Sequence, residues 1–255
     1  SSQAIKHSSS NRVFWRWLLP LVAIIFNMLS LYSLAFGTSN YRASLADNLD
    51  LDRKNVSADE LYETYQSVNV QLNALLDEIN FEEQGASEMP YSFYELSTML
   101  NDAYDEYCGS HDYISTFYAM PKAVALSEPM TYTHISGVYS FFTGEANVNT
   151  NYPDYVIPYT MAHEMAHQRG IAREDEANFV AFLVCMESDD DYIKYSALLS
   201  MQEYLLSALG KASKEQYSTA YYSLDLRVRY EMRSYSKFFD KYRSSTAATV
   251  TNAVN

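Results

Sequence analysis

Apolar residues recur every three or four positions over most of this 255-residue chain, which is the spacing of amphipathic helices. The clearest case follows Ser57-Ala58-Asp59-Glu60, a capping box that favours the start of a helix, and runs to about residue 79. The same periodicity predicts helices at 93–109, 174–186, 192–210 and 217–242. With only 7 glycines and 6 prolines, the chain is not expected to form a turn-rich all-β fold.

Residues 123–149 depart from the helical pattern. β-Branched and aromatic residues lie here among turn formers, which predicts two or three short strands. In the last of them, Ala146 and Val148 alternate with Asn147 and Asn149. The predicted fold class is therefore α+β, predominantly helical, with a small sheet.

Leu18 to Phe36 is a stretch of 19 residues without a charged side chain, long enough to span a bilayer as a helix. Trp15 and Trp17 lie at its start, where aromatic belts form. The flank before it carries basic residues and no acid, so the positive-inside rule places the N-terminus in the cytoplasm and the remainder outside. A cleavable signal peptide and a buried core helix are the alternatives. The basic residues are Lys6, Arg12 and Arg16.

These features predict a cytoplasmic basic flank at 1–17, a transmembrane helix at 18–36, an extracytoplasmic domain at 40–243 and a flexible tail at 244–255. We expect the chain to be truncated at both ends. The net charge of −14 argues against a nucleic acid as partner. Two cysteines, at positions 108 and 185, are too few for a disulfide framework, and the sequence leaves their pairing open.

The run His163-Glu164-Met165-Ala166-His167 has the form H-E-x-x-H. Residues four apart lie on one face of a helix, so both histidines can bind one zinc ion. A carboxylate as third ligand would leave one position for water, whose pKa zinc lowers to about 7. Glu164 would then accept the proton as general base. The alternative is a helix with two solvated histidines.

Gly170 can take the left-handed conformation that ends a helix, and a second helix is predicted from Glu174. Glu174, Asp175 and Glu176 are all candidates for the third ligand. The region resembles the gluzincin group of zinc peptidases, where a glutamate opening a run E-x-x-A-[DN] is that ligand. The resemblance implies that Glu174 binds zinc, with Glu176 as the alternative, and that Asn178 orients a ligand histidine.

A wider set of segments resembles bacterial membrane proteins of the family "domain of unknown function 3810", which carry a presumed zinc-peptidase site. These segments are Asn40–Arg42, Phe142–Asn149, Ile157–Thr160, His163–Asn178 and Lys194–Ser196. The resemblance implies a membrane-anchored, zincin-like metallopeptidase domain of the gluzincin type.

We therefore expect one zinc ion per chain and hydrolysis of a peptide or protein substrate outside the cytoplasmic membrane. Peptidases of this kind hold substrate as an added strand, so Glu145–Asn149 is predicted to be the edge strand, with an ordinary solvent-facing strand as alternative. Two other classes of function stay open. One is a zinc-binding sensor or envelope assembly module without turnover, and the other is a metal-free helical binding protein.

Overall fold

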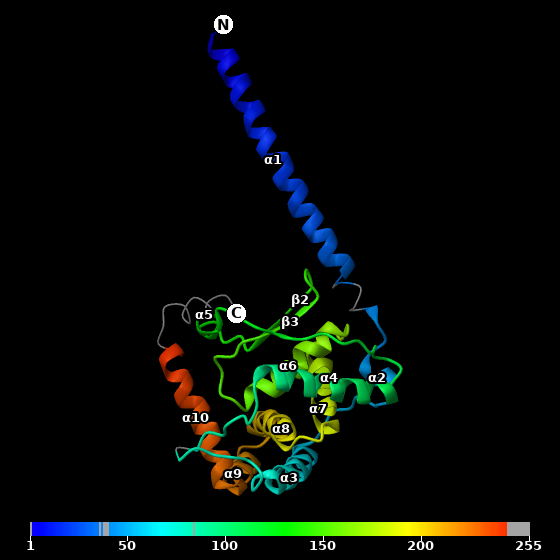
Figure 1. The fold of residues 1–255 in the computed structure, drawn as a ribbon, viewed down its shortest axis with the longest axis vertical. Coiled ribbons are helices and arrows are strands. Elements are labelled where there is room, and N and C mark those ends of the chain that lie inside the picture. The colour runs from blue at the N-terminus through cyan, green and yellow to red at the C-terminus, as the bar shows by residue number, and fades with distance from the viewer. Residues whose placement is uncertain (1, 36, 38–40, 84, 244–255) are drawn as a thin grey trace. The chain divides into compact units, whose positions relative to one another are not determined.

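The computed structural model describes residues 2–35, 37, 41–83 and 85–243 (Figure 1). In the first helix, side chains are described for residues 14–34. The predicted tail at 244–255 lies outside the described residues. The elements are α1 (Ser2–Ala35), α2 (Leu45–Asn48), α3 (Ala58–Leu75), α4 (Phe93–Ser110), β1 (Lys122–Ala123), α5 (Ser127–Thr131), β2 (Gly137–Ser140), β3 (Glu145–Val148), α6 (Val156–Gln168), α7 (Glu174–Glu187), α8 (Asp191–Ala212), α9 (Lys214–Ser223) and α10 (Leu226–Arg243).

Two compact units make up the chain: Ser1–Arg42 with Phe141–Thr143, and Ala43–Ser140 with Gly144–Asn255. In the first unit, α1 has an apolar window at Phe14–Leu34, and within the described residues it is the one helix long and apolar enough to cross a membrane. A membrane anchor and a signal sequence share these properties. The amide of Asn27 donates to the carbonyl of Ala23 in the same helix at 2.7 Å, so this polar side chain needs no neighbouring helix.

The predicted helices of the second unit are confirmed, with one exception. Ser57 caps α3 as its sequence indicates, because its Oγ accepts from the Glu60 amide and its own amide donates to the Glu60 carboxylate. The single helix predicted at 217–242 is wrong. The backbone is extended at the buried Leu224, and the Asp225 carboxylate accepts from the amide of Arg227 at 2.8 Å, so α9 ends and α10 begins there.

The sheet has the order β1-β3-β2, with β1 parallel and β2 antiparallel to β3. The prediction of short strands at 123–149 is confirmed, although the five-residue helix α5 lies among them. The prediction that Glu145–Asn149 forms the edge strand is wrong, since β3 is hydrogen-bonded on both sides. Ala146 and Val148 are fully buried, which accounts for the alternation seen in the sequence.

Helix α6 lies at the centre of the second unit, packed against α4, α7, α8, β2 and β3 (Figure 1). It is buried on almost every face, which accounts for the apolar residues that surround the H-E-x-x-H motif in its sequence. Ser196 of α8 holds its first turn, since its hydroxyl accepts from the amide of Tyr159 at 3.0 Å and donates to the carbonyl of Tyr155. The neighbouring helices therefore fix the position of α6.

Glu231 and Glu203 are acidic residues of the second unit that form no ion pair within the described residues. Glu231 of α10 is only 1% exposed and accepts hydrogen bonds from the Ser87 amide and the Tyr195 hydroxyl. Burial raises its pKa. Glu203 of α8 accepts from the hydroxyl of Tyr155 at 3.2 Å, and burial raises its pKa to about 7. The ionised form of Glu203 is therefore destabilised in the folded chain at neutral pH.

Glu203→Gln is expected to make the protein more stable above pH 7. The folded-state pKa lies above the unfolded value, so the stabilisation by Glu203 is complete below about pH 4.5 and is lost as pH rises through about 7. Glutamine does not titrate, and the gain in free energy of unfolding at about pH 8 is roughly 3 kcal/mol at most. Unfolding of the detergent-solubilised chain at about pH 5 and about pH 8 measures this. Glu215→Gln, on the exposed surface of α9, is the control and should have the same stability as wild type at both pH values.

Candidate metal centre

Side chains from α6 and α7 meet at one point of the second unit. His163 and His167 lie one turn apart on α6, and their Nε2 atoms are 3.0 Å from each other. Glu174, the first residue of α7, places its Oε2 atom 3.2 Å from Nε2 of His163 and 3.5 Å from Nε2 of His167. Its side chain is 77% exposed, so the group opens to solvent on this side.

These three atoms have the spacing of a zinc site. Ligands at 2.0–2.1 Å from a tetrahedral zinc ion lie about 3.3 Å from one another. The three observed separations are 3.0, 3.2 and 3.5 Å. Two imidazoles and one carboxylate are also the donor set of one class of catalytic zinc sites. The residues therefore fit a zinc ion, although other divalent metals accept the same donors.

A backbone carbonyl orients His167. Its Nδ1 donates to the carbonyl of Ile171 at 2.7 Å, which leaves the lone pair of Nε2 directed toward His163 and Glu174. The chain can turn back to make this bond because Gly170 adopts a φ of 85°, the left-handed conformation predicted for it. The sequence motif gave no sign of this contact, because the acceptor is a main-chain atom.

Asn178, predicted to orient a histidine, lies on α7 beside His163. Burial and the neighbouring His167 lower the pKa of His163 to about 4, whereas Glu174 and the side chain of Asn178 oppose this shift. Nδ1 of His163 is buried and accepts or donates no hydrogen bond within the described residues. Asn178 is therefore near enough to influence the pKa of His163. Of the two histidines, it is His167 whose Nδ1 forms a hydrogen bond with a backbone carbonyl, that of Ile171.

Glu164 lies beneath the edge strand β2. Its side chain contacts Gly137, where an added Cβ would lie 2.6 Å from Oε1, and it accepts a hydrogen bond from the backbone of Tyr139. The ring of Tyr139 also stacks against His167, with centroids 6.4 Å apart. Glu164 is 5% exposed, and burial followed by the charge of Glu174 raises its pKa to about 8. Gly137 and Tyr139 are thus site residues that the sequence reasoning missed.

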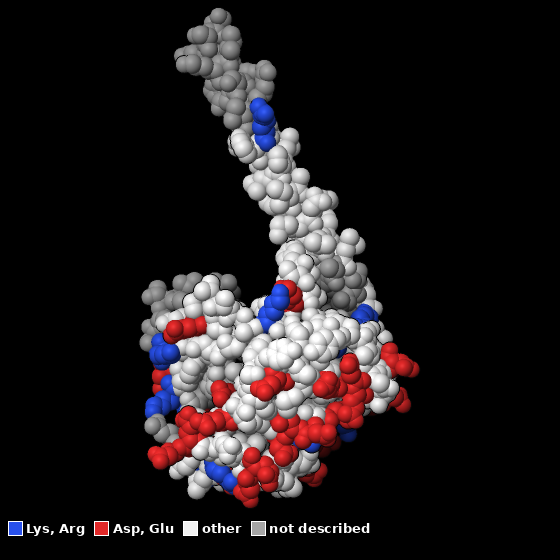
Figure 2. All heavy atoms as spheres, in the orientation of Figure 1, with Lys and Arg blue, Asp and Glu red and all other residues white. Residues whose placement is uncertain are grey.

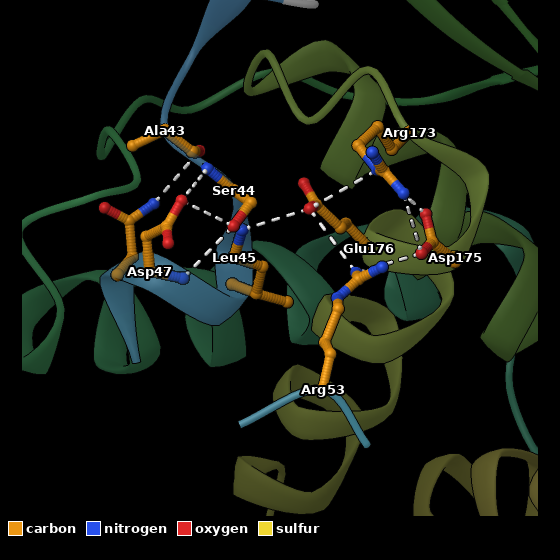
Figure 3. Close-up of polar contacts among 9 residues, drawn as sticks. Ala43, Ser44, Leu45, Asp47, Arg53, Arg173, Asp175 and Glu176 are labelled. Carbon is orange, nitrogen blue, oxygen red and sulfur yellow. Dashed lines mark hydrogen bonds and ion pairs between the residues drawn. The ribbon is translucent and has the colours of Figure 1, made fainter. Parts of the chain in front are cut away.

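Glu176 has a different role from Glu174, although the two are close in sequence. Its carboxylate is 6% exposed and accepts from the amide of Leu45 at 3.1 Å (Figure 3). Arg53 and Arg173 lie 3.6 and 3.5 Å from the same oxygen. Glu176 therefore fastens the segment that begins at α2 to the first turn of α7, and its carboxylate is not among the three converging ligand atoms.

Glu174→Gln is expected to lower zinc affinity and Glu176→Gln is expected to lower stability, although both substitutions neutralise one carboxylate on the same helical turn. Glu174→Gln should weaken zinc binding by about 100-fold or more, because it removes the anionic donor. Glu176→Gln should keep zinc affinity within about threefold and lower stability by about 1 kcal/mol, since the Leu45 amide keeps an acceptor. Competition with a chelating dye and denaturant unfolding measure the two effects. If Glu176→Gln lost the metal and Glu174→Gln kept it, the assignment would be wrong.

Other histidine, cysteine and acidic side chains have different surroundings. His111 stacks on Tyr107, and His134 packs against Phe239. Glu145 of β3 forms an ion pair with Lys122 of the neighbouring strand β1. Both cysteines, at positions 108 and 185, are buried free thiols. Within the described residues, His163, His167 and Glu174 form the one group of three or more His, Cys, Asp or Glu residues that could hold a metal ion.

One known protein family covers almost the whole chain. The family described as "Protein of unknown function (DUF3810)" matches residues 2–255. The chain belongs to this family. The resemblance noted from separate sequence segments is therefore confirmed over nearly the whole chain. No curated protein and no solved structure matches it. What this DUF3810 member does must therefore be inferred from its own residues.

Proposed function

We propose that this protein is a membrane-anchored zinc peptidase of the gluzincin type, with a zincin-like domain. The convergence of His163 Nε2, His167 Nε2 and Glu174 Oε2 at tetrahedral-ligand spacing is the observation that carries the proposal. The two histidines and Glu174 would hold the ion. A bound zinc ion acidifies water and polarises a carbonyl oxygen.

Glu164 supplies the proton transfers in this proposal. Its carboxylate contacts Gly137 of β2 and lies near enough to Glu174 for that charge to raise its pKa, which supports a role beside the proposed metal ligands. It accepts a proton from the attacking water and delivers that proton to the amine that leaves the cleaved peptide bond. Burial favours its protonated form, which suits the second of these steps.

The edge strand β2 is the proposed binding element for substrate. It is an outer strand in the order β1-β3-β2, and it contacts α6. An extended peptide can add to such an edge through main-chain hydrogen bonds. This replaces β3, whose two edges are already paired. The substrate class in this proposal is a peptide or protein segment in extended conformation.

We assign the domain to the outer side of the cytoplasmic membrane, with α1 as its anchor. The apolar window of α1 supports an anchor, and the basic residues that precede it support a cytoplasmic N-terminus. Acidic residues cover much of the face of the second unit shown in Figure 2. Because Asp and Glu have little effect on membrane orientation, they are compatible with this assignment.

A non-catalytic zinc-binding module is the second candidate function. The burial of Glu164 and His167, at 5% and 8% exposed, favours it because a substrate would have little direct access to these side chains. Such a module would bind the ion through the same three residues and would hydrolyse nothing. The two functions therefore share the metal and differ in turnover.

The test is metal analysis followed by a peptide screen. The full chain, purified in detergent, should contain about one zinc per chain by elemental analysis, and it should cleave members of a peptide library detected by mass spectrometry. Removal of zinc by a chelator should stop cleavage and added zinc should restore it. Zinc without any cleavage would favour the non-catalytic module. No zinc after refolding with the metal would contradict both candidates.

A further inference from the structure

Basic residues are concentrated on α10. This helix holds 6 of the 18 lysines and arginines in a chain whose net charge is −14. Arg233, Lys237 and Lys241 follow one another at intervals of four, so they form a row about 12 Å long on one face of the helix. All three are exposed. In Figure 2 basic atoms lie at the edge of the domain where Figure 1 shows α10.

The row borders a groove of about 530 Å³. Arg233, Lys237 and Lys241 line the groove together with Tyr230 and Phe238 of the same helix, and distant from them in sequence are Glu82 and Ala86, from the turn in which the Gly85 amide donates to the Glu82 carbonyl. This turn packs directly on α10, because a Cβ at Gly85 would overlap the Cβ of Tyr230 and Gly85 has a φ of 89°. The turn is therefore held in place against the helix.

The cations of the groove are only partly neutralised. Lys241 Nζ lies 3.4 Å from Glu128 Oε1, but Arg233 and Lys237 form no ion pair within the described residues. The guanidinium of Arg233 lies over the ring of Tyr230 at 5.7 Å. Glu82 is the one carboxylate among the lining residues. The groove therefore offers an excess of positive charge with aromatic surface beside it, which suits an anionic group attached to an apolar body.

We propose that this groove binds the phosphate headgroups of anionic phospholipids and so orients the domain on the membrane. The inference rests on α1 being an anchor and not on peptidase activity. Nine residues, 36–44, join α1 to α2, and they span at most about 32 Å. An anchored domain therefore stays close to the lipid surface. Since the chain as a whole is acidic, the anionic surface repels most of the domain and attracts the row on α10.

The test compares the acetylation rates of lysines in the full chain in lipid nanodiscs, measured by mass spectrometry. Lys237 and Lys241 report on the groove, while Lys211 and Lys214, at the junction of α8 and α9, are internal controls. In discs with about one third phosphatidylglycerol, the groove lysines should react about fivefold more slowly than in pure phosphatidylcholine. The control lysines should change by less than about twofold, and about 0.5 M salt should remove the difference.

A pair of variants with the same change in charge sharpens the result. Arg233→Glu with Lys237→Glu should abolish the protection of Lys241, whereas Lys211→Glu with Lys214→Glu should leave it intact. Equal slowing of all four wild-type lysines, or no slowing, would overturn the proposal. Equal protection by soluble glycerol phosphate in neutral discs would also overturn it, because the groove would then take a free phosphate ester. None of these outcomes depends on whether the metal centre is catalytic.

Discussion

Glu164→Gln is expected to lower peptide hydrolysis by about 1000-fold while zinc stays bound. General acid–base groups contribute about 10²–10⁴ to rate, and Glu164 is the buried carboxyl group that follows His163, one of the proposed ligands. The amide of glutamine has nearly the same size, so the contacts with Gly137 and the backbone of Tyr139 should persist. The measurement is the initial rate on the best substrate from the library, with zinc content determined on the same sample.

His163→Ala is the companion variant, since it should lose both zinc and hydrolysis. Its Nε2 atom is one of the three converging ligand atoms, and two donors hold zinc far more weakly than three. Zinc retained with activity lost in Glu164→Gln, and both lost in His163→Ala, would separate proton transfer from metal binding. Wild-type hydrolysis by Glu164→Gln would show that another group accepts the proton.

Local sequence features predicted those parts of the site that depend on neighbours in the chain. The four-residue interval between His163 and His167 fixes their common face once a helix forms, and Gly170 supplies the left-handed turn that ends it. The position of Glu174 at the first residue of the next helix follows from the same short turn. These features need only helix geometry and one permissive glycine.

Features that depend on distant segments could not be predicted in this way. Glu176 and Glu174 have the same side chain on the same turn, and only the approach of Leu45 and Arg53, from more than 120 positions away, draws Glu176 to another partner. Which strand lies at the edge of the sheet is likewise a matter of pairing, and the alternation in β3 arises from burial alone. The alternation in the sequence therefore predicts which residues of a strand are buried, but it does not predict which strands pair with it.

Gly137→Ala is expected to lower the rate of hydrolysis by about 100-fold with little effect on zinc affinity. A Cβ at this position would lie 2.6 Å from Oε1 and 2.7 Å from Cγ of Glu164, so one of the two must move. The Glu164 side chain can shift more easily than the backbone of β2, and a displacement of about 1 Å at a reacting group costs about 100-fold in rate. The loss should be in kcat, because the three atoms nearest to the new Cβ all belong to Glu164 and none belongs to the three proposed metal ligands.

Gly109→Ala is the matched control for this substitution. It adds the same methyl group near the end of α4, where the new Cβ meets no atom within 4 Å outside its own stretch of helix, and it should retain wild-type kcat and at least wild-type stability. Zinc affinity of Gly137→Ala should stay within about threefold of wild type, and its thermal unfolding should show that the domain still folds. A wild-type kcat in Gly137→Ala would mean that the contact between β2 and Glu164 does not position the carboxylate. Loss of zinc together with activity would mean that β2 supports the ligand histidines, so that the strand's part in the site is structural and not confined to Glu164.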